Sequence, residues 1–226
     1  MSALTVFKVA LTAYNIIKTR FTNYKVEKAL IELANGKKSI NEICNNHSEV
    51  FRFTTLIDSL NKSSTYSKAN VLKDLYLTFD GSENTDEVDD LFFEIFSILG
   101  ELSDREIHLL YLLERYHSED IQNKRSVEKY AKYFEKITDE GHGIGGDLSD
   151  SFYYFVSDKM NIKPDYIVGL MKRLERSGLI ITTVINGNAK FQEYEHSVLY
   201  AEIKTRLIIA MESSYGSSDT LTSDHI

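Results

Sequence analysis

One proline in 226 residues is the feature that most constrains how this chain folds. Proline breaks helix interiors and glycine weakens them, so a chain with only Pro164 and eleven glycines keeps long segments that favour helix. Hydrophobic residues make up 42% of the chain and charged residues 27%, which provides for a core and argues against disorder of the whole chain. We therefore expect a folded, mainly α-helical protein with one large domain or two modest ones.

Charge is distributed unevenly along the chain. Residues 1–38 carry a net charge of +5, residues 39–156 carry −12 and residues 157–192 carry +3, within a total of −8. The acidic total argues against a protein whose whole surface binds nucleic acid or anionic lipid. A local basic patch remains compatible with it, and the two basic stretches are where such a patch is expected.

Cysteine content and hydropathy indicate the cellular environment. The single cysteine, Cys44, excludes a disulfide within the chain and fits a reducing, cytoplasmic location. The most apolar stretch, residues 3–17, contains Lys8 and is shorter than the roughly 18 residues of a membrane-spanning helix. It also lacks the charge and cleavage pattern of a secretory signal. We expect no membrane contact, and a first helix that is buried or faces a partner.

Residues 1–79 form a predicted helical N-terminal region. Apolar residues recur at three-and-four spacing across 4–34, which predicts one long amphipathic helix. Ser39, with Glu42 three positions later, forms a capping-box pattern and predicts the start of a second helix. A shorter helix is expected over 69–79.

A polar segment at 80–85 (DGSENT) marks the clearest break in the chain and predicts a linker. Its glycine follows the first aspartate directly, so the segment lacks the ligand spacing of a calcium-binding loop. A helix with acidic first turns is expected over 86–99. Ser103 followed by Glu106 is a second capping-box pattern, which predicts another helix over 105–116.

The pattern after residue 149 is more specific. An apolar helix ends at Asn161, a residue that tolerates the left-handed conformation of a tight turn. Pro164 stands at a favourable first position of the next helix, predicted over 165–177, and Gly178 is a typical residue to end it. The sequence therefore predicts two helices joined by a tight turn.

A β-hairpin is expected next. Runs rich in β-branched and apolar residues lie on either side of Asn186-Gly187, which is the strongest short hairpin signal. A two-residue turn there would place Val184 opposite Ala189 and Thr182 opposite Phe191.

Two helices, a glycine stop and a hairpin in this order resemble the winged helix-turn-helix superfamily, especially the class of multiple-antibiotic-resistance repressors. Residues 160–180 (MNIKPDYIVGLMKRLERSGLI) and the wing at 182–191 (TTVINGNAKF) carry the resemblance. It implies a mainly α fold, with a helical N-terminal half plus a winged-helix C-terminal half with one β-hairpin wing. The winged-helix domain would span 86–211 with an insertion at 118–148, and 212–226 would be a disordered tail.

The resemblance also implies a recognition helix at 163–176 that lies in the major groove of DNA. Its base-edge candidates are Asp165 and Tyr166. The candidates for phosphate contacts are the basic residues of the module, which are Lys159, Lys163, Lys172, Arg173, Arg176 and Lys190. Hydrogen-bonded readout favours Arg, Lys, Asn or Gln at the exposed early positions, where this chain also has Val168 and Gly169. The alternative is that the basic residues form only the solvated face of an amphipathic helix.

Other candidate sites lack the pattern that their chemistry needs. Glu114 and His117 have the spacing of a di-iron helix, but the second such motif is missing, so a surface helix end is expected. His108 is expected to be half-buried. The glycine-rich segment 141–146 has no preceding strand and no lysine followed by Ser or Thr, so a connector is expected rather than a phosphate loop. We predict no catalytic residue, no metal site and no cofactor.

The leading hypothesis is a non-enzymatic winged-helix regulator, or a subunit of a DNA-associated complex, that binds double-stranded DNA. The alternative is an adaptor that uses the winged helix as a surface for docking a protein. A homodimer or a protein partner would contact the N-terminal helix or the helix at 196–211. The apolar stripe expected on that second helix consists of Leu199, Ile203, Leu207 and Met211.

Overall fold

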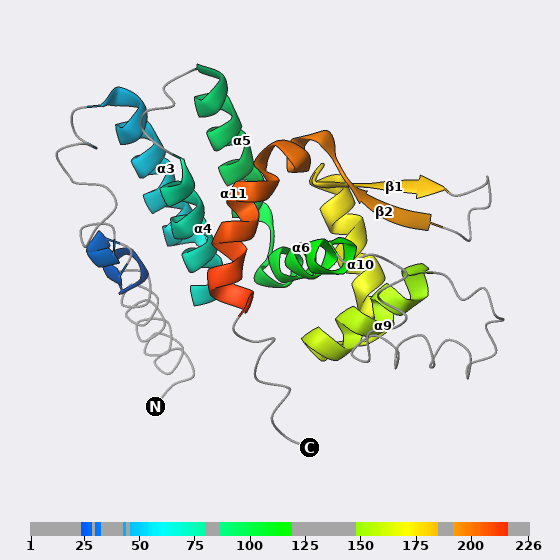
Figure 1. Ribbon diagram of the computed structural model, residues 1–226. Helices are drawn as coiled ribbons and strands as arrows, with labels where there is room; N and C mark the ends of the chain where they lie inside the picture. The colour runs from blue at the N-terminus through cyan, green and yellow to red at the C-terminus, as the bar shows by residue number, and fades with distance from the viewer. Residues whose placement is uncertain are drawn as a thin grey trace, which may run out of the picture. The chain divides into compact units, whose positions relative to one another are not determined.

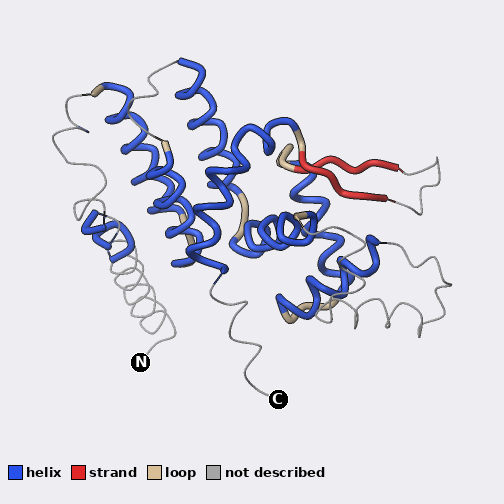
Figure 2. The backbone as a smooth tube through the Cα atoms, viewed as in Figure 1, coloured by secondary structure: helices blue, strands red, loops and turns tan. Residues whose placement is uncertain are grey.

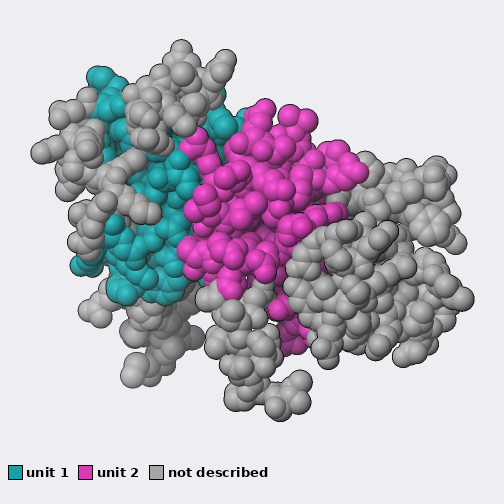
Figure 3. All heavy atoms as spheres, viewed as in Figure 1, with its two compact units in different colours: residues 1–101 teal, residues 102–226 magenta. Residues whose placement is uncertain are grey.

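The computed structural model describes residues 24–28, 30–32, 43, 46–79, 86–118, 148–184 and 192–216 (Figure 1). These residues are mainly helical and include one two-stranded antiparallel sheet, so the predicted mainly α class is confirmed (Figure 2). The chain divides into two compact units, Met1–Glu101 and Leu102–Ile226 (Figure 3). Within the described ranges, no helix is long and apolar enough to cross a membrane.

The first unit contains helices α3 (His47–Lys62), α4 (Tyr66–Thr78) and α5 (Asp86–Glu101). Helix α3 packs against both α4 and α5. Because α5 packs within this unit, the division between the units follows Glu101, whereas the sequence placed the break at 80–85. Residues 80–85 themselves lie outside the described residues.

Polar caps set the helix starts in this unit. Asn46 has extended backbone angles, and its side chain accepts a hydrogen bond from the Glu49 amide at 3.4 Å. Helix α3 therefore begins at His47. The predicted helix start at Ser39 lies outside the described residues, and Ile43 is helical. Thr65 caps α4 in the same way through the Lys68 amide at 3.2 Å, so α4 begins three residues before the predicted residue 69.

Phe92 is the centre of an aromatic cluster in the first unit. Its ring stacks on Phe96 with a centroid distance of 4.2 Å and meets Phe79 edge-on at 5.0 Å. Aliphatic side chains complete this core, and its fully buried members are Leu56, Leu60, Val71, Leu72, Leu75, Ile95 and Leu99.

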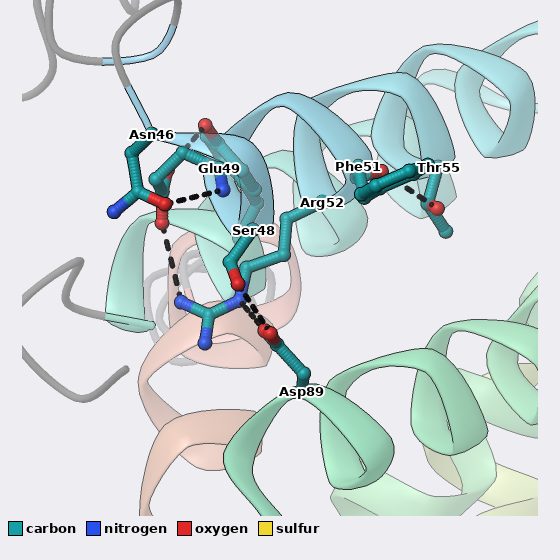
Figure 4. Close-up of polar contacts among 8 residues, drawn as sticks. Asn46, Ser48, Glu49, Phe51, Arg52, Thr55 and Asp89 are labelled. Atoms are coloured by element: carbon teal, nitrogen blue, oxygen red, sulfur yellow. Dashed lines mark hydrogen bonds and ion pairs between the residues drawn. The ribbon is translucent and has the colours of Figure 1, made fainter. Parts of the chain in front are cut away.

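A buried arginine connects α3 with α5 (Figure 4). The side chain of Arg52 is 0% exposed, and its Nε donates to Asp89 Oδ1 at 2.6 Å while its Nη1 donates to Glu49 Oε1 at 3.2 Å. Ser48 Oγ donates to the other Asp89 oxygen at 2.5 Å. From α4, Tyr76 OH donates to Glu49 Oε2 at 3.1 Å, so polar contacts at one cluster join α3, α4 and α5.

The second unit contains helices α6 (Asp104–His117), α9 (Leu148–Met160), α10 (Pro164–Arg176) and α11 (Val198–Tyr215). Strands β1 (Ile180–Val184) and β2 (Gln192–His196) form its hairpin. Helix α6 packs against α9, α10 and α11, and α10 also packs against α9 and β1. Helix α6 therefore packs against each of the other described helices of this unit.

The local signals around α10 are confirmed. Asn161, the residue directly after α9, has a positive φ of 51°, and Pro164 occupies the first turn of α10. Gly178 has a φ of 80°, a conformation that glycine adopts without a steric cost. The Ser103–Glu106 capping box at the start of α6 is also present in full.

The strand register differs from the prediction. Val184 pairs with Gln192, Thr182 with Tyr194 and Ile180 with His196. The predicted pairs Val184–Ala189 and Thr182–Phe191 are therefore wrong. Each β1 residue pairs with a residue three positions later in the chain than a two-residue Asn-Gly turn would require. Residues 185–191, which include Lys190, lie outside the described residues.

Helix α11 extends to Tyr215, four residues beyond the predicted limit of 211. Residues 212–215 are thus helical and do not belong to the predicted disordered tail. Ile203, Leu207 and Met211 are each 0% exposed, and Leu199 is half-buried. The expectation that this stripe forms a free dimer surface is wrong, since its side chains lie in the chain's own interior.

Candidate nucleic-acid interface

Helix α10 separates apolar and polar side chains onto opposite faces. Ile167, Leu170, Met171 and Leu174 are buried at the three-and-four spacing that puts them on one side. The opposite side, which we call the α10 face, consists of exposed residues: Asp165, Tyr166, Val168, Gly169, Lys172, Arg173 and Arg176. The core of the second unit therefore fixes which side of the predicted recognition helix is presented to solvent.

The first half of the α10 face is poor in hydrogen-bond donors. Tyr166 is 68% exposed and Val168 is 45% exposed, which are high values for large side chains of this type. Asp165, the other base-edge candidate, is exposed in the first turn of the helix. Lys163 precedes it as the N-cap residue and makes no side-chain capping bond.

The second half of the α10 face carries the basic residues. Lys172 Nζ lies 2.9 Å from Glu175 Oε2 in a surface ion pair. Arg176 is exposed, and its Nε donates to the backbone oxygen of Lys172 at 3.4 Å. Surface pairs of this kind contribute little stability, so both side chains can exchange these contacts for others at low cost.

Arg173 has a different environment from its basic neighbours. Its Nε lies 2.7 Å from Oε1 of Glu106, a residue that is 3% exposed. The other oxygen of Glu106 accepts from the Ser103 amide at 2.6 Å and completes the capping box of α6. Arg173 thus joins α10 to the first turn of α6, a role that the sequence did not predict.

Arg173→Ala is expected to lower the free energy of unfolding of the second unit by about 1–2 kcal/mol, because it removes the cation beside a buried carboxylate. The loss is smaller than for a fully buried pair, since half of the Arg173 side chain is exposed. Chemical denaturation followed by circular dichroism measures it. Arg176→Ala is the matched control and is expected to change stability by less than about 0.5 kcal/mol. Equal effects of the two substitutions would contradict a structural role for Arg173.

The remaining candidates do not all lie on the α10 face. Lys159 is half-buried in the last turn of α9. Lys190 lies outside the described residues. The structure thus brings Lys172, Arg173 and Arg176 together in the second half of α10, with Lys163 at the N-cap of that helix. The predicted wing contact lies outside the described residues.

A second polar cluster surrounds Glu114 in α6. Glu114 is 5% exposed, so the prediction of a surface helix end is wrong for this residue, although His117 is exposed. Lys204 Nζ of α11 lies 2.8 Å from Glu114 Oε1, and Tyr200 OH donates to Oε2 at 3.4 Å. His196 stacks on the Tyr200 ring at 4.2 Å, with its Nε2 3.4 Å from Glu114 Oε2.

The environment of this cluster shifts its pKa values. Burial lowers the pKa of His196 to about 4, against the attraction of the Glu114 carboxylate and with a smaller contribution from His117. Burial, with Glu114 nearby, raises the pKa of Tyr200 above its usual range. The imidazole is therefore neutral near pH 7, and the cluster joins α6, β2 and α11.

Some of these contacts had no signal in the sequence. Glu106 and Arg173 are far apart in the chain, as are Glu114 and Lys204, and no short motif links them. His108 is half-buried as expected and stacks on Tyr215 at 4.6 Å. Among the described residues, no group of three or more His, Cys, Asp and Glu side chains is arranged to hold a metal ion.

Comparison of the chain with protein families, curated proteins and solved structures gave no match. Because no similar protein indicates a function, the hypothesis below is based on the α10 face and on the order of the helices and strands in the second unit.

Proposed function

We propose that the second unit binds double-stranded DNA through the α10 face, as part of a non-enzymatic regulator or a DNA-associated complex. The observation that carries this proposal is the exposure of one complete side of α10 with basic residues in its second half. Duplex DNA attracts such a surface, since phosphate contacts supply most of the sequence-independent affinity.

The order of elements supports the proposal. Helices α6, α9 and α10 are followed by the β1–β2 hairpin (Figure 1), and α10 packs against α9 and β1. The α10 face remains exposed. A winged helix-turn-helix uses this order to present its second helix to the major groove and its hairpin to the adjoining backbone.

Reversing two charges on the α10 face tests the proposal. Lys172→Glu with Arg176→Glu is expected to weaken duplex binding at least about tenfold and to lower the salt slope by about two, because two phosphate contacts are lost. Arg173 is left intact, since its reversal would place a second carboxylate beside buried Glu106. Fluorescence anisotropy with a random-sequence duplex at two salt concentrations measures the effect.

The matched control is Lys28→Glu with Lys62→Glu, which changes the net charge equally at exposed positions of the first unit. It is expected to alter affinity by no more than about twofold at physiological salt, where distant charges are screened. An equal loss in both double variants would mean that overall charge, and not the α10 face, governs binding.

A protein-docking adaptor is the second candidate. The high exposure of Tyr166 and Val168 favours it, as do the carboxylates that already neutralise Lys172 and Arg173. The anisotropy titration at low salt separates the two functions, because an adaptor is expected to show no duplex binding there.

A further inference from the structure

We propose that α10 reads duplex DNA at the C5-methyl groups of thymine, with Tyr166 and Val168 as the contacting side chains and Gly169 as the point of closest approach. This inference rests on the proposed DNA-binding function and adds to it the kind of base edge that is recognised.

In the part of the chain that the structure describes, nothing requires position 169 to be glycine. It lies in the interior of α10, where glycine is less favourable than alanine by about 1 kcal/mol. Its φ is not positive, and a Cβ added there would meet no atom within 4 Å. Neither backbone conformation nor packing within the described structure requires a missing side chain, so contact with a partner explains this residue better.

The position of Gly169 on the α10 face indicates where that partner approaches. Asp165 and Tyr166 lie one turn before it, and Lys172 and Arg173 lie one turn after it, at the three-and-four spacing of a single helix face. The bare backbone at Gly169 thus separates an aromatic first half from a basic second half. A duplex whose phosphates meet the basic half would bring base edges against Gly169 and the residues before it.

The side chains at this end select the kind of base edge. Arg, Lys, Asn and Gln, which read guanine or adenine through paired hydrogen bonds, are absent from the exposed positions between Pro164 and Gly169. Tyr166 and Val168 instead present apolar surface. In the major groove, the apolar feature of a base pair is the thymine C5-methyl group, which makes contacts with aromatic and aliphatic side chains.

Replacing thymine by uracil tests this directly, because it removes the methyl group and keeps every hydrogen-bonding group of the base. The probe is the duplex bound most tightly from a random pool, resynthesised with deoxyuridine in place of thymidine. Affinity is expected to fall about fourfold for each methyl group that the protein contacts. In Tyr166→Ala with Val168→Ala, the two duplexes should bind equally, since the side chains that sense the methyl groups are gone.

Gly169→Ala tests the close approach. This variant is expected to melt about 2–4 °C higher, as alanine favours helix, and to bind the thymine duplex about tenfold more weakly. Gly100→Ala is the matched control, because Gly100 lies in α5 and an added Cβ there also meets no atom within 4 Å. It should keep its DNA affinity.

The outcomes separate the two proposals. Tight binding with equal affinity for the thymine and uracil duplexes would overturn methyl readout and leave DNA binding standing. Unchanged binding by Gly169→Ala would overturn the close approach at α10. Absence of binding to any duplex at low salt would overturn the proposed function and this inference with it.

Discussion

Replacing Arg52 with alanine is expected to lower the free energy of unfolding of the first unit by about 3–5 kcal/mol. Its guanidinium is fully buried between Glu49 and Asp89, and it lies 5.8 Å from the centre of the Phe92 ring. The substitution leaves the buried Glu49 carboxylate without this cation, and desolvation of that charge is then less well compensated. The hydrogen bond from Tyr76 to Glu49 is kept, but it supplies only part of the lost interaction.

Two further variants separate charge from packing at Arg52. Arg52→Lys keeps the charge but cannot form the two-directional contact to Glu49 and Asp89, so an intermediate loss is expected. Arg52→Met with Glu49→Gln removes the charges of both Arg52 and Glu49. This double variant should recover much of the stability that Arg52→Ala loses. Urea denaturation followed by circular dichroism gives the free energies. A loss below about 1 kcal/mol for Arg52→Ala would show that the cluster contributes little.

Acidification is expected to destabilise the second unit by as much as about 3 kcal/mol through His196 alone. Burial lowers its pKa to about 4, whereas an unfolded chain has a histidine pKa near 6.5. Between these values the unfolded chain binds a proton that the folded chain does not. The free energy of unfolding therefore decreases as the pH falls from about 6.5 to 4. Above pH 6.5 the histidine is neutral in both states, so the protein keeps the full free energy of unfolding that acidification removes.

His196→Phe isolates this effect, because phenylalanine can keep the ring stack on Tyr200 but carries no titratable group. The difference in unfolding free energy between the parent and this variant is expected to change by about 2–3 kcal/mol between pH 7 and pH 4. Urea denaturation at a series of pH values measures it. His47→Gln, at an exposed position of the first unit, is the control and should follow the parent. Parallel curves for the parent and His196→Phe would show that the histidine proton is not linked to folding.

Local signals in the sequence predicted local structure well. Asn161, Pro164 and Gly178 mark the ends of α9 and α10 because each has a backbone preference that its neighbours do not alter. The Ser103–Glu106 spacing predicted the start of α6 because a capping box is complete within four residues. Asn46 provides the cap of α3, a helix start that the sequence analysis did not predict.

The sequence by itself determined the helical class, the helix boundaries around α10 and the amphipathic character of that helix, because these depend on residues within one or two turns. Only the tertiary structure decided the β1–β2 register, the burial of the α11 stripe and the partners of Arg52, Arg173 and Glu114. The free energy of those contacts depends on which helices pack together and on how far water is excluded between them. A charged residue in a helix has the same local pattern in solvent and beside a buried carboxylate, and packing alone distinguishes the two.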